Sequence, residues 1–327
     1  MFFFGEGEEY KDLIIVKKTQ YFDINIITFF NFKFYYNQDI MSNKILDGKK
    51  LAEKLNSELK KQVKIAAEKT GIRPKLATIL VGKDPASKVY VNIKHRTCQS
   101  VGIDSIIIEL EENISKEELL EKIDKINKDA SIHGILVQIP LPEHLRDYTP
   151  EFLEKISPLK DADGLNSVTR GKLFDYNEDQ GPCTPKGIIS LLEHNNIDLK
   201  GKDVVIINRS NLVGKPLIFM LLKRNATVTI CHTSTKDIDS YLQKADIVIV
   251  AVRKPKFITK ERIKEGAILI DVGINRIEGK LCGDVDFEGV LDKCGKITPV
   301  PGGIGPMTVA MLCENTFFLY KKQMELP

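Results

Sequence analysis

The chain has 327 residues, a formal net charge of +3 and 43% hydrophobic residues, which is enough for about two domains with buried cores. The nearly balanced charge does not indicate a nucleic-acid-binding surface. Lysines are interspersed with glutamates along helical stretches, as is usual on a helix face exposed to solvent. Six cysteines show no C-x-x-C spacing and five histidines form no H-x-x-x-H pair, so the sequence predicts no metal site and no disulfide framework, and a reducing cytoplasm is the simpler setting.

The first forty residues differ from the rest of the chain, because they hold 12 of its 24 aromatic residues. Charged residues between Glu6 and Asp12 interrupt any early apolar run, and no basic segment precedes it. The pattern therefore predicts neither a signal peptide nor a membrane span. A regular amphipathic pattern begins at Met41. We expect Met41 to be the natural start and residues 1–40 to be a non-native or poorly ordered extension.

Apolar runs alternate with amphipathic stretches in the first half of the chain. Short apolar runs bounded by proline or glycine are typical of buried strands, and the stretches between them are typical of helices. The expected elements are helices at 48–69, 87–102 and 116–129 and strands at 76–81, 105–110 and 134–142. Strands that alternate with helices need crossover connections, so we expect a parallel sheet in an α/β layer.

A loop-rich connector at 157–164 divides the chain, and a helix entered at a proline follows it. The apolar runs beyond that helix lie at 204–207, 227–231, 247–252 and 267–271. Their alternation with helical segments is typical of a parallel-sheet nucleotide domain. A last helix at 306–323 is expected to return to the first domain. We therefore expect a two-domain α/β protein, with residues 41–180 and 306–327 in one domain and 181–305 in the other.

Tyr90 and Lys94 lie four residues apart in the helix that Ser87 can cap and Gly102 can end. Positions i and i+4 share one helix face, so the ring and the amine lie on the same patch. A lysine that is partly removed from water can transfer protons near neutral pH. The plain alternative is a surface lysine beside a core tyrosine.

The segment from Asn208 to Gly214 has the layout of a turn between a strand and a helix, but it lacks the G-x-G-x-x-G pattern. Such a turn presents free backbone N–H groups to which a pyrophosphate can bind, although a purely structural turn is the alternative. The next strand has no acidic residue at its end. Because an acid there binds the ribose of NAD and an arginine suits a 2′-phosphate, Arg209 with Thr233 favours NADP.

Five separated blocks occur in an order that resembles the bifunctional methylenetetrahydrofolate dehydrogenase/methenyltetrahydrofolate cyclohydrolase family. The likeness covers residues 42–323. The blocks are Ser87-x-x-Tyr90-Val-x-x-Lys94, Gly134-Ile-Leu-Val-Gln-Ile-Pro-Leu-Pro142, Lys160-Asp-Ala-Asp-Gly164, Arg209-Ser-Asn-Leu-Val-Gly-Lys-Pro216 and Thr298-Pro-Val-Pro-Gly-Gly-Ile-Gly-Pro-Met-Thr308.

The resemblance implies an N-terminal catalytic domain, a Rossmann-like NADP domain and a folate bound in the cleft between them. It identifies Lys94 as the catalytic lysine and Gln138 as the amide beside it. Tyr90 matches the ring that packs on the folate, and Asp163 matches the carboxylate that holds the pterin. The further positions that match folate contacts are Val137, Ile139, Pro301, Gly302, Gly303, Ile304 and Gly305. Those that match dinucleotide contacts are Asn208, Arg209, Ser210, Thr233 and Ile274. Asn208 departs from the family pattern, since many members have glycine at this position. The difference affects how tightly the phosphate-binding turn can close.

The family reaction is oxidation of 5,10-methylenetetrahydrofolate by NADP⁺ followed by hydrolysis of the methenyl product to 10-formyltetrahydrofolate, in one-carbon metabolism. Lys94 would transfer the protons and Gln138 would hold its amine, the plain alternative for Gln138 being a strand-end residue that satisfies backbone groups. A carboxylate at Asp163 can accept two adjacent pterin N–H groups, the alternative being an Asx turn, and Asp161 then suits the purely structural role. The resemblance also implies a cytoplasmic homodimer whose partners are tetrahydrofolate derivatives, without a nucleic-acid or membrane partner.

Three other interpretations fit parts of the sequence. A different dehydrogenase, such as one acting on shikimate or an amino acid, would also join an α/β substrate domain to a nucleotide domain. A nucleotide-binding regulatory module that has lost catalysis is the non-enzyme alternative. Within the family, a relative with only one of the two activities is possible.

Overall fold

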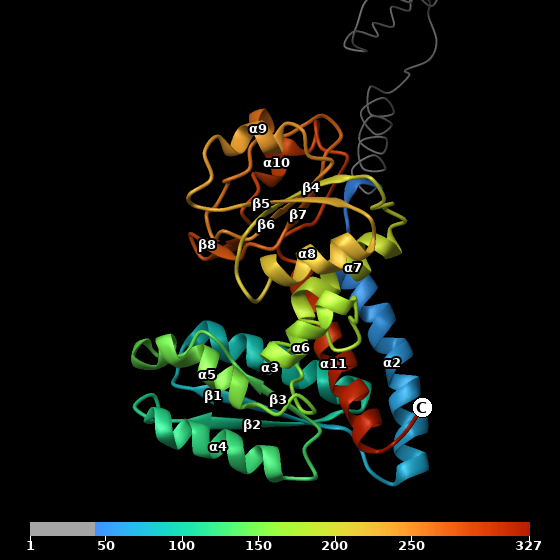
Figure 1. Cartoon of the computed structure of the whole chain (residues 1–327), viewed down its shortest axis with the longest axis vertical. Helices are drawn as coiled ribbons and strands as arrows, with labels where there is room; N and C mark the ends of the chain where they lie inside the picture. The colour runs from blue at the N-terminus through green and yellow to red at the C-terminus, as the bar shows by residue number, and fades with distance from the viewer. Residues whose placement is uncertain (1–42) are drawn as a thin grey trace, which may run out of the picture. The chain divides into compact units, whose positions relative to one another are not determined.

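The computed structural model describes residues 43–327 (Figure 1). The expectation that Met41 is the natural start, and that residues 1–40 form an extension, concerns residues outside this range. The described chain contains two parallel sheets, one of three strands and one of five, and a short antiparallel hairpin. We call the part around the three-stranded sheet the first lobe and the part around the five-stranded sheet the second lobe.

The first lobe follows the predicted order of helices and strands. Its elements are α2 (Gly48–Thr70), β1 (Lys75–Val81), α3 (Pro85–Val101), β2 (Asp104–Leu110), α4 (Lys116–Lys128), β3 (Gly134–Val137), η1 (Glu143–Tyr148), α5 (Thr149–Lys155), α6 (Ser167–Gly171) and η2 (Lys172–Asp175). The sheet order is β2-β1-β3 and all pairs are parallel. Because side chains alternate along a strand, Ala77 and Ile79 pack with α4, whereas Leu76 packs on the side of α2 and α3.

The N-cap of α3 lies three residues before Ser87, the residue that was expected to cap the helix. Asp84 is the N-cap, and its carboxylate accepts the N–H of Ser87 at 2.7 Å, with Pro85 at the first helical position. The hydrogen bond from this backbone N–H lowers the pKa of Asp84 below its ordinary value. Aspartate before proline is a strong start signal, because proline loses no intrahelical hydrogen bond there. Gly102 ends the helix in the left-handed conformation at φ 90°, as predicted.

The second lobe contains a parallel sheet with the order β10-β7-β6-β4-β5. Its elements are α7 (Cys183–His194), β4 (Asp203–Ile207), α8 (Gly214–Lys223), β5 (Thr227–Cys231), α9 (Ile238–Leu242), β6 (Ile247–Val250), η3 (Lys260–Arg262), β7 (Ile268–Asp271), β8 (Asn275–Ile277), β9 (Lys280–Cys282), α10 (Phe287–Val290), β10 (Lys296–Ile297) and α11 (Ile304–Gln323). After β4 the chain adds β5 on one side and β6 on the other, so the strand order reverses at β4. In open α/β sheets, ligands bind at the carboxyl ends of the strands at such a switch point.

Helices α2, α7 and α11 pack together between the two sheets (Figure 1). Helix α11 packs against α2 and α7 and also contacts α3, β1 and β3. One apolar cluster contains side chains from both sheets, among them Leu76 and Leu136 of the first lobe and Val204 and Ile247 of the second. The predicted class, α/β with two parallel-sheet domains, is confirmed. The residue boundaries given for the two domains stay a prediction.

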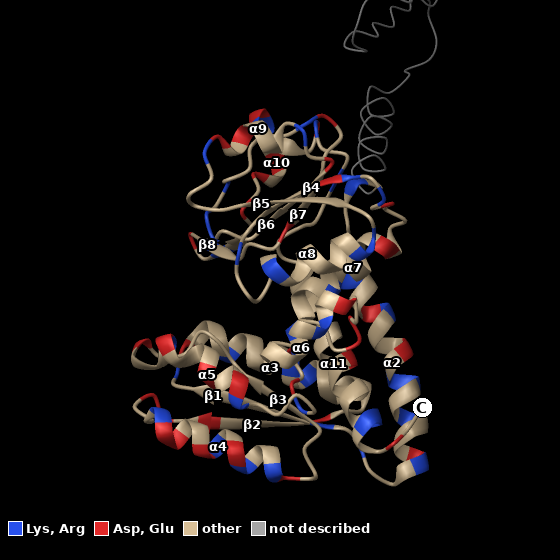
Figure 2. Cartoon of the chain, viewed as in Figure 1, with Lys and Arg blue, Asp and Glu red and all other residues tan. Residues whose placement is uncertain are grey.

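Charged residues cover the outer helices of both lobes, whereas the strands are largely free of them (Figure 2). Figure 2 shows lysine, arginine and acidic residues interspersed along α2 and α4, as expected for solvated helix faces. Among residues 43–327, no helix has the length and apolar content needed to cross a membrane.

Candidate active site

Lys94 and Gln138 meet although 44 positions separate them along the chain. The Nζ of Lys94, on α3, donates a hydrogen bond of 2.9 Å to Oε1 of Gln138, which follows the last residue of β3. The backbone N–H of Gln138 donates to the carbonyl of Ile79, and its Nε2 donates to the carbonyl of Ile139 at 2.7 Å. These bonds hold the buried amide so that its oxygen faces the lysine.

Tyr90 lies one turn before Lys94 on α3 and is half-buried. Burial raises the pKa of its hydroxyl, and the positive charge of Arg276 acts in the opposite direction. Arg276 belongs to β8 in the second lobe, so the β8–β9 hairpin comes within electrostatic reach of the Tyr90 ring. Neither this hairpin nor Arg276 was predicted from the sequence, because two three-residue polar strands have no apolar periodicity.

The two aspartates of the connector have different environments. Asp161 is buried, and its carboxylate accepts the N–H groups of Gly164 and Leu165 on one oxygen and that of Asn166 on the other. Burial raises the pKa of Asp161 to about 6, against the backbone hydrogen bonds that favour the ion. Asp163 is only half-buried, and its carbonyl accepts the N–H of Cys183 at 3.2 Å. The structural role expected for Asp161 is confirmed.

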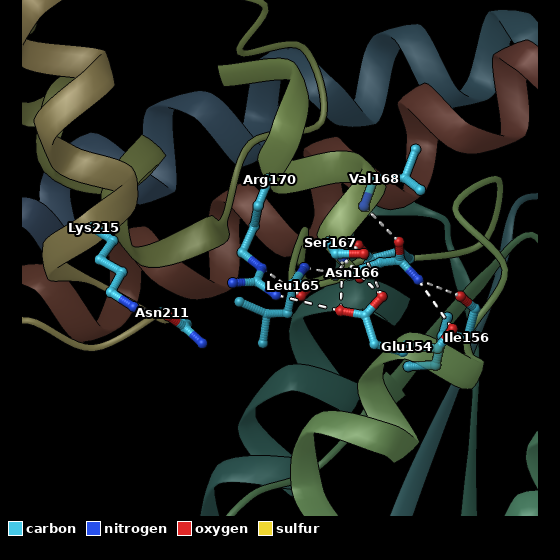
Figure 3. A network of polar contacts seen from close by, with 10 residues as sticks. Glu154, Ile156, Leu165, Asn166, Ser167, Val168, Arg170, Asn211 and Lys215 are labelled. Carbon is cyan, nitrogen blue, oxygen red and sulfur yellow. Dashed lines mark hydrogen bonds and ion pairs between the residues drawn. The ribbon is translucent and has the colours of Figure 1, made fainter. Parts of the chain in front are cut away.

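The connector is fixed to its surroundings by a polar network centred on Glu154 (Figure 3). The Glu154 carboxylate accepts the N–H and hydroxyl of Ser167 and forms a 3.3 Å ion pair with Arg170. Asn166 accepts the N–H of Val168 and donates to two carbonyls at the end of α5. The short helix α6 is thereby tied to α5, which holds the loop carrying Asp163 in place.

The charges of both the aspartate and the lysine act on a buried thiol. Cys183 opens α7, and burial raises the pKa of its thiol well above the ordinary value. Asp163 raises it further, while the positive charges of Lys186 and Lys94 oppose the shift. Cys183 is therefore within electrostatic reach of both predicted catalytic side chains. Its only sequence signal was its place after the proline that starts the helix, and scattered cysteines without metal spacing gave no reason to select it.

The glycine-rich turn predicted to line the folate side runs from Pro301 to Gly305. Gly302 has φ 111°, a conformation that favours glycine, and its carbonyl accepts the N–H of Lys49 at the start of α2. A Cβ atom placed at Gly48 would lie 2.7 Å from the carbonyl carbon of Gly303, so the two segments touch through their backbones. Within the predicted folate set, Gly303, Ile304 and Val137 are buried, Gly302, Gly305 and Ile139 are intermediate, and Pro301 is exposed.

The turn after β4 is organised by the side chain of Asn208. Its Oδ1 accepts the N–H groups of Ser210 and Gly214 and the Ser210 hydroxyl, and its Nδ2 donates to the carbonyl of Ala251 at 2.7 Å. The N–H of Val213 donates to the Ser210 hydroxyl and that of Lys215 to the Ser210 carbonyl. The expectation that the turn offers these N–H groups to an anion is therefore wrong for four of them, because internal acceptors already occupy them.

The other residues assigned to the dinucleotide lie near the carboxyl ends of the strands. Arg209, Thr233 and Ile274 are exposed after β4, β5 and β7, and these ends meet at one edge because the strands are parallel. Ser210 donates its hydroxyl to Asn208. Lys215, which follows the turn, donates to the side chain of Asn211 at 2.9 Å (Figure 3). A site for a phosphorylated dinucleotide needs a cationic side chain, no acidic residue at the end of β5 and a reversal of strand order. These strand ends have all three features.

Comparison with known proteins agrees with this geometry. The catalytic-domain model of the tetrahydrofolate dehydrogenase/cyclohydrolase family matches residues 46–163, and its NAD(P)-binding-domain model matches residues 182–324. The chain belongs to this family. The bifunctional protein FolD of Sulfurihydrogenibium sp. (strain YO3AOP1) is 52% identical over 282 residues, which are 86% of this chain and 98% of that protein.

Solved structures of family members superpose on the described fold. The FolD methylenetetrahydrofolate dehydrogenase/cyclohydrolase of Campylobacter jejuni has a TM-score of 0.81 at 48% identity, over 85% of this chain and 98% of that one. The FolD of Trypanosoma brucei, complexed with NADP cofactor and an inhibitor, has a TM-score of 0.81 at 35% identity, over 86% and 98%. The predicted family is confirmed, and the chain is a dehydrogenase and cyclohydrolase of folate chemistry. Membership sets aside both an unrelated dehydrogenase and a non-catalytic regulatory module.

Proposed function

We propose that this chain oxidises 5,10-methylenetetrahydrofolate to the 5,10-methenyl form with NADP⁺ and hydrolyses that product to 10-formyltetrahydrofolate, with Lys94 transferring the protons of hydrolysis. The observation that supports this best is the 2.9 Å hydrogen bond between Lys94 Nζ and Gln138 Oε1. The buried amide gives the amine one fixed acceptor, which leaves its other hydrogens or its lone pair for the substrate.

A single amine can carry out the proton transfers between the water and the ring nitrogen during hydrolysis. A neutral Lys94 can take a proton from water as the water oxygen bonds to the methenyl carbon. The resulting ammonium can give this proton to the ring nitrogen as the carbon–nitrogen bond breaks, and the hydroxyl proton leaves to solvent. Positioned acid–base groups of this kind contribute about 10²–10⁴-fold to a rate.

Tyr90 and Asp163 are proposed to orient the folate. Tyr90 shares the helix face of Lys94 one turn away, so a ring stacked on it would lie beside the amine. The Asp163 carboxylate would accept two adjacent N–H donors of the pterin as a bidentate pair. The charges of Asp163 and Lys94 both act on the Cys183 thiol, which supports a common site for the three roles.

NADP is proposed as the cofactor, and when bound it supplies the hydride acceptor for the oxidation. Arg209 and Thr233 would hold its 2′-phosphate beside the acid-free end of β5, and Ile274 would contact it after β7. Asn208 would act through the shape of the turn, since its side chain is committed to internal hydrogen bonds. The second lobe would contribute position and charge to the reaction.

The assembly and compartment are also proposals. A homodimer is supported by apolar side chains left exposed on neighbouring elements, namely Val89 and Ile93 on α3 and Ile106 on β2, an edge strand. We propose that residues 41–180 with 306–327 form the catalytic domain and 181–305 the NADP domain. All six cysteines are free thiols, which is consistent with a reducing cytoplasm.

The test is replacement of Lys94 by methionine, which keeps most of the side-chain volume and removes the amine. Hydrolysis of methenyltetrahydrofolate, followed by its absorbance, should fall about 10²–10⁴-fold, while calorimetric binding of NADP⁺ stays as in the wild type. Lys88→Met is the matched control, because Lys88 lies on the same helix six residues earlier. Wild-type hydrolysis by Lys94→Met would remove the lysine from the mechanism.

A further inference from the structure

The ends of β4 and β6 are joined directly at the switch point of the second lobe. The Asn208 side chain donates to the carbonyl of Ala251 at 2.7 Å, and the N–H of Ala251 donates to the carbonyl of Ile207 at 3.3 Å. Arg209 follows Asn208, and Arg253 lies two residues after Ala251. Two arginines are therefore carried by the two strand ends at which a dinucleotide is expected to cross the sheet.

The backbone around Arg253 has an unusual conformation with a clear cause. Arg253 has φ 55°, a left-handed conformation that is uncommon for residues other than glycine. It turns three successive N–H groups, those of Val252, Arg253 and Lys254, toward the carboxylate of Asp284 at 2.6, 3.1 and 2.8 Å. Asp284 is completely buried, so the N–H groups face the interior while Arg253 itself is exposed.

The guanidinium groups of Arg209 and Arg253 have no acidic partner. Within residues 43–327, no carboxylate lies at ion-pair distance from either, whereas Lys256 in the same loop pairs with Asp286 at 2.9 Å. The backbone of the neighbouring turn supplies little compensation for an anion, because four of its N–H groups are already bonded. Cationic side chains at the strand ends are therefore the better candidates to bind the diphosphate.

We propose that Arg253 binds the pyrophosphate bridge of the dinucleotide. This inference rests on the proposed cofactor role of the second lobe. The 2′-phosphate belongs at the end of β5, and β6 lies on the opposite side of β4 from β5. The β6 end thus faces the bridge, which NAD⁺ and NADP⁺ share. Arg209 discriminates between the two dinucleotides, whereas Arg253 strengthens the binding of both.

The experiment compares Arg253→Gly with wild type by titration calorimetry, using NADP⁺, NAD⁺ and adenosine 2′-monophosphate as separate probes. Glycine removes the guanidinium and accepts the left-handed backbone without strain. The dissociation constants for NADP⁺ and NAD⁺ should rise by the same factor of about ten or more, as expected for loss of a charged hydrogen bond. Binding of adenosine 2′-monophosphate, which lacks the bridge, should not change.

Lys256→Gly is the matched control. Lys256 is in the same loop, carries the same charge and also has a positive φ of 54°, but it is paired with Asp286. It should bind all three probes like the wild type. An unchanged NADP⁺ affinity in Arg253→Gly, an equal loss in Lys256→Gly, or a loss confined to NADP⁺ and adenosine 2′-monophosphate would each overturn the proposal.

An assay of methenyltetrahydrofolate hydrolysis without dinucleotide tests the proposed function independently of the role of Arg253. Arg253→Gly should retain wild-type hydrolysis, because Lys94 and Gln138 lie in the first lobe. If the wild-type enzyme itself neither hydrolyses this substrate nor binds NADP⁺, the proposed function fails. If wild type does both and Arg253→Gly binds equally well, only the role of Arg253 fails.

Discussion

Replacing Gly214 by alanine tests whether the Asn208 turn positions the cofactor. Gly214 opens α8, and a Cβ atom placed there would lie 2.6 Å from the carbonyl carbon of Asn208 and nearer still to its oxygen. Real Cβ atoms hardly ever approach closer than 3.0 Å, so the turn must open. Because the Asn208 side chain is bonded to Ala251, the end of β6 must move with it.

The size of the effect follows from this displacement. Overpacking of backbone costs about 1–3 kcal/mol of folding stability, and a misplacement on the order of 1 Å can reduce a rate about 10²-fold. We expect the dehydrogenase kcat/KM of Gly214→Ala to fall about 10- to 100-fold. Hydrolysis of methenyltetrahydrofolate should be retained, since Lys94 and Gln138 are held by contacts within the first lobe.

The assay measures NADP⁺ reduction, NADP⁺ binding and hydrolysis on the same preparation. Gly171→Ala is the control, because Gly171 is helical and a Cβ atom there would meet nothing within 4 Å. That variant should match the wild type or be slightly more stable, as alanine favours a helix. If Gly214→Ala binds and reduces NADP⁺ as well as Gly171→Ala does, the turn does not have the positioning role assigned to it.

Two further predictions concern stability and assembly. Because burial raises the folded-state pKa of Asp161 from 3.8 to about 6, the stability that wild type gains from this group is present below pH 4 and lost as the pH rises to 6. The difference in unfolding free energy between wild type and Asp161→Asn should therefore shrink by about 3 kcal/mol across that interval, and urea unfolding that shows a constant difference would contradict the assignment. Ile93→Glu should shift the protein toward monomer in sedimentation, because it places a charge in the exposed apolar face of α3, whereas a dimer of unchanged stability would move the interface elsewhere.

Much of the fold was predictable because its signals are local. The strands β1, β4 and β5 are short apolar runs with clear boundaries, and α3 ends at a glycine, as expected. Prediction failed where local signals were weak or competed. The cap of α3 is Asp84 and not Ser87, since both are good caps and the adjacent proline decides. The β8–β9 hairpin has too few residues to show a period.

The sequence by itself determined the order of elements, the parallel sheets and the pairing of Tyr90 with Lys94 on one helix face, because these depend on periodicities of two and 3.6 residues. The family resemblance also predicted Gln138 beside Lys94, and the structure shows the hydrogen bond between them. Only the tertiary structure decided that Cys183 is within electrostatic reach of Lys94 and that the Asn208 side chain accepts N–H groups otherwise open to an anion. Such contacts join residues that are distant in the chain or depend on the orientation of one side chain. Packing sets them, and no spacing along the sequence records them.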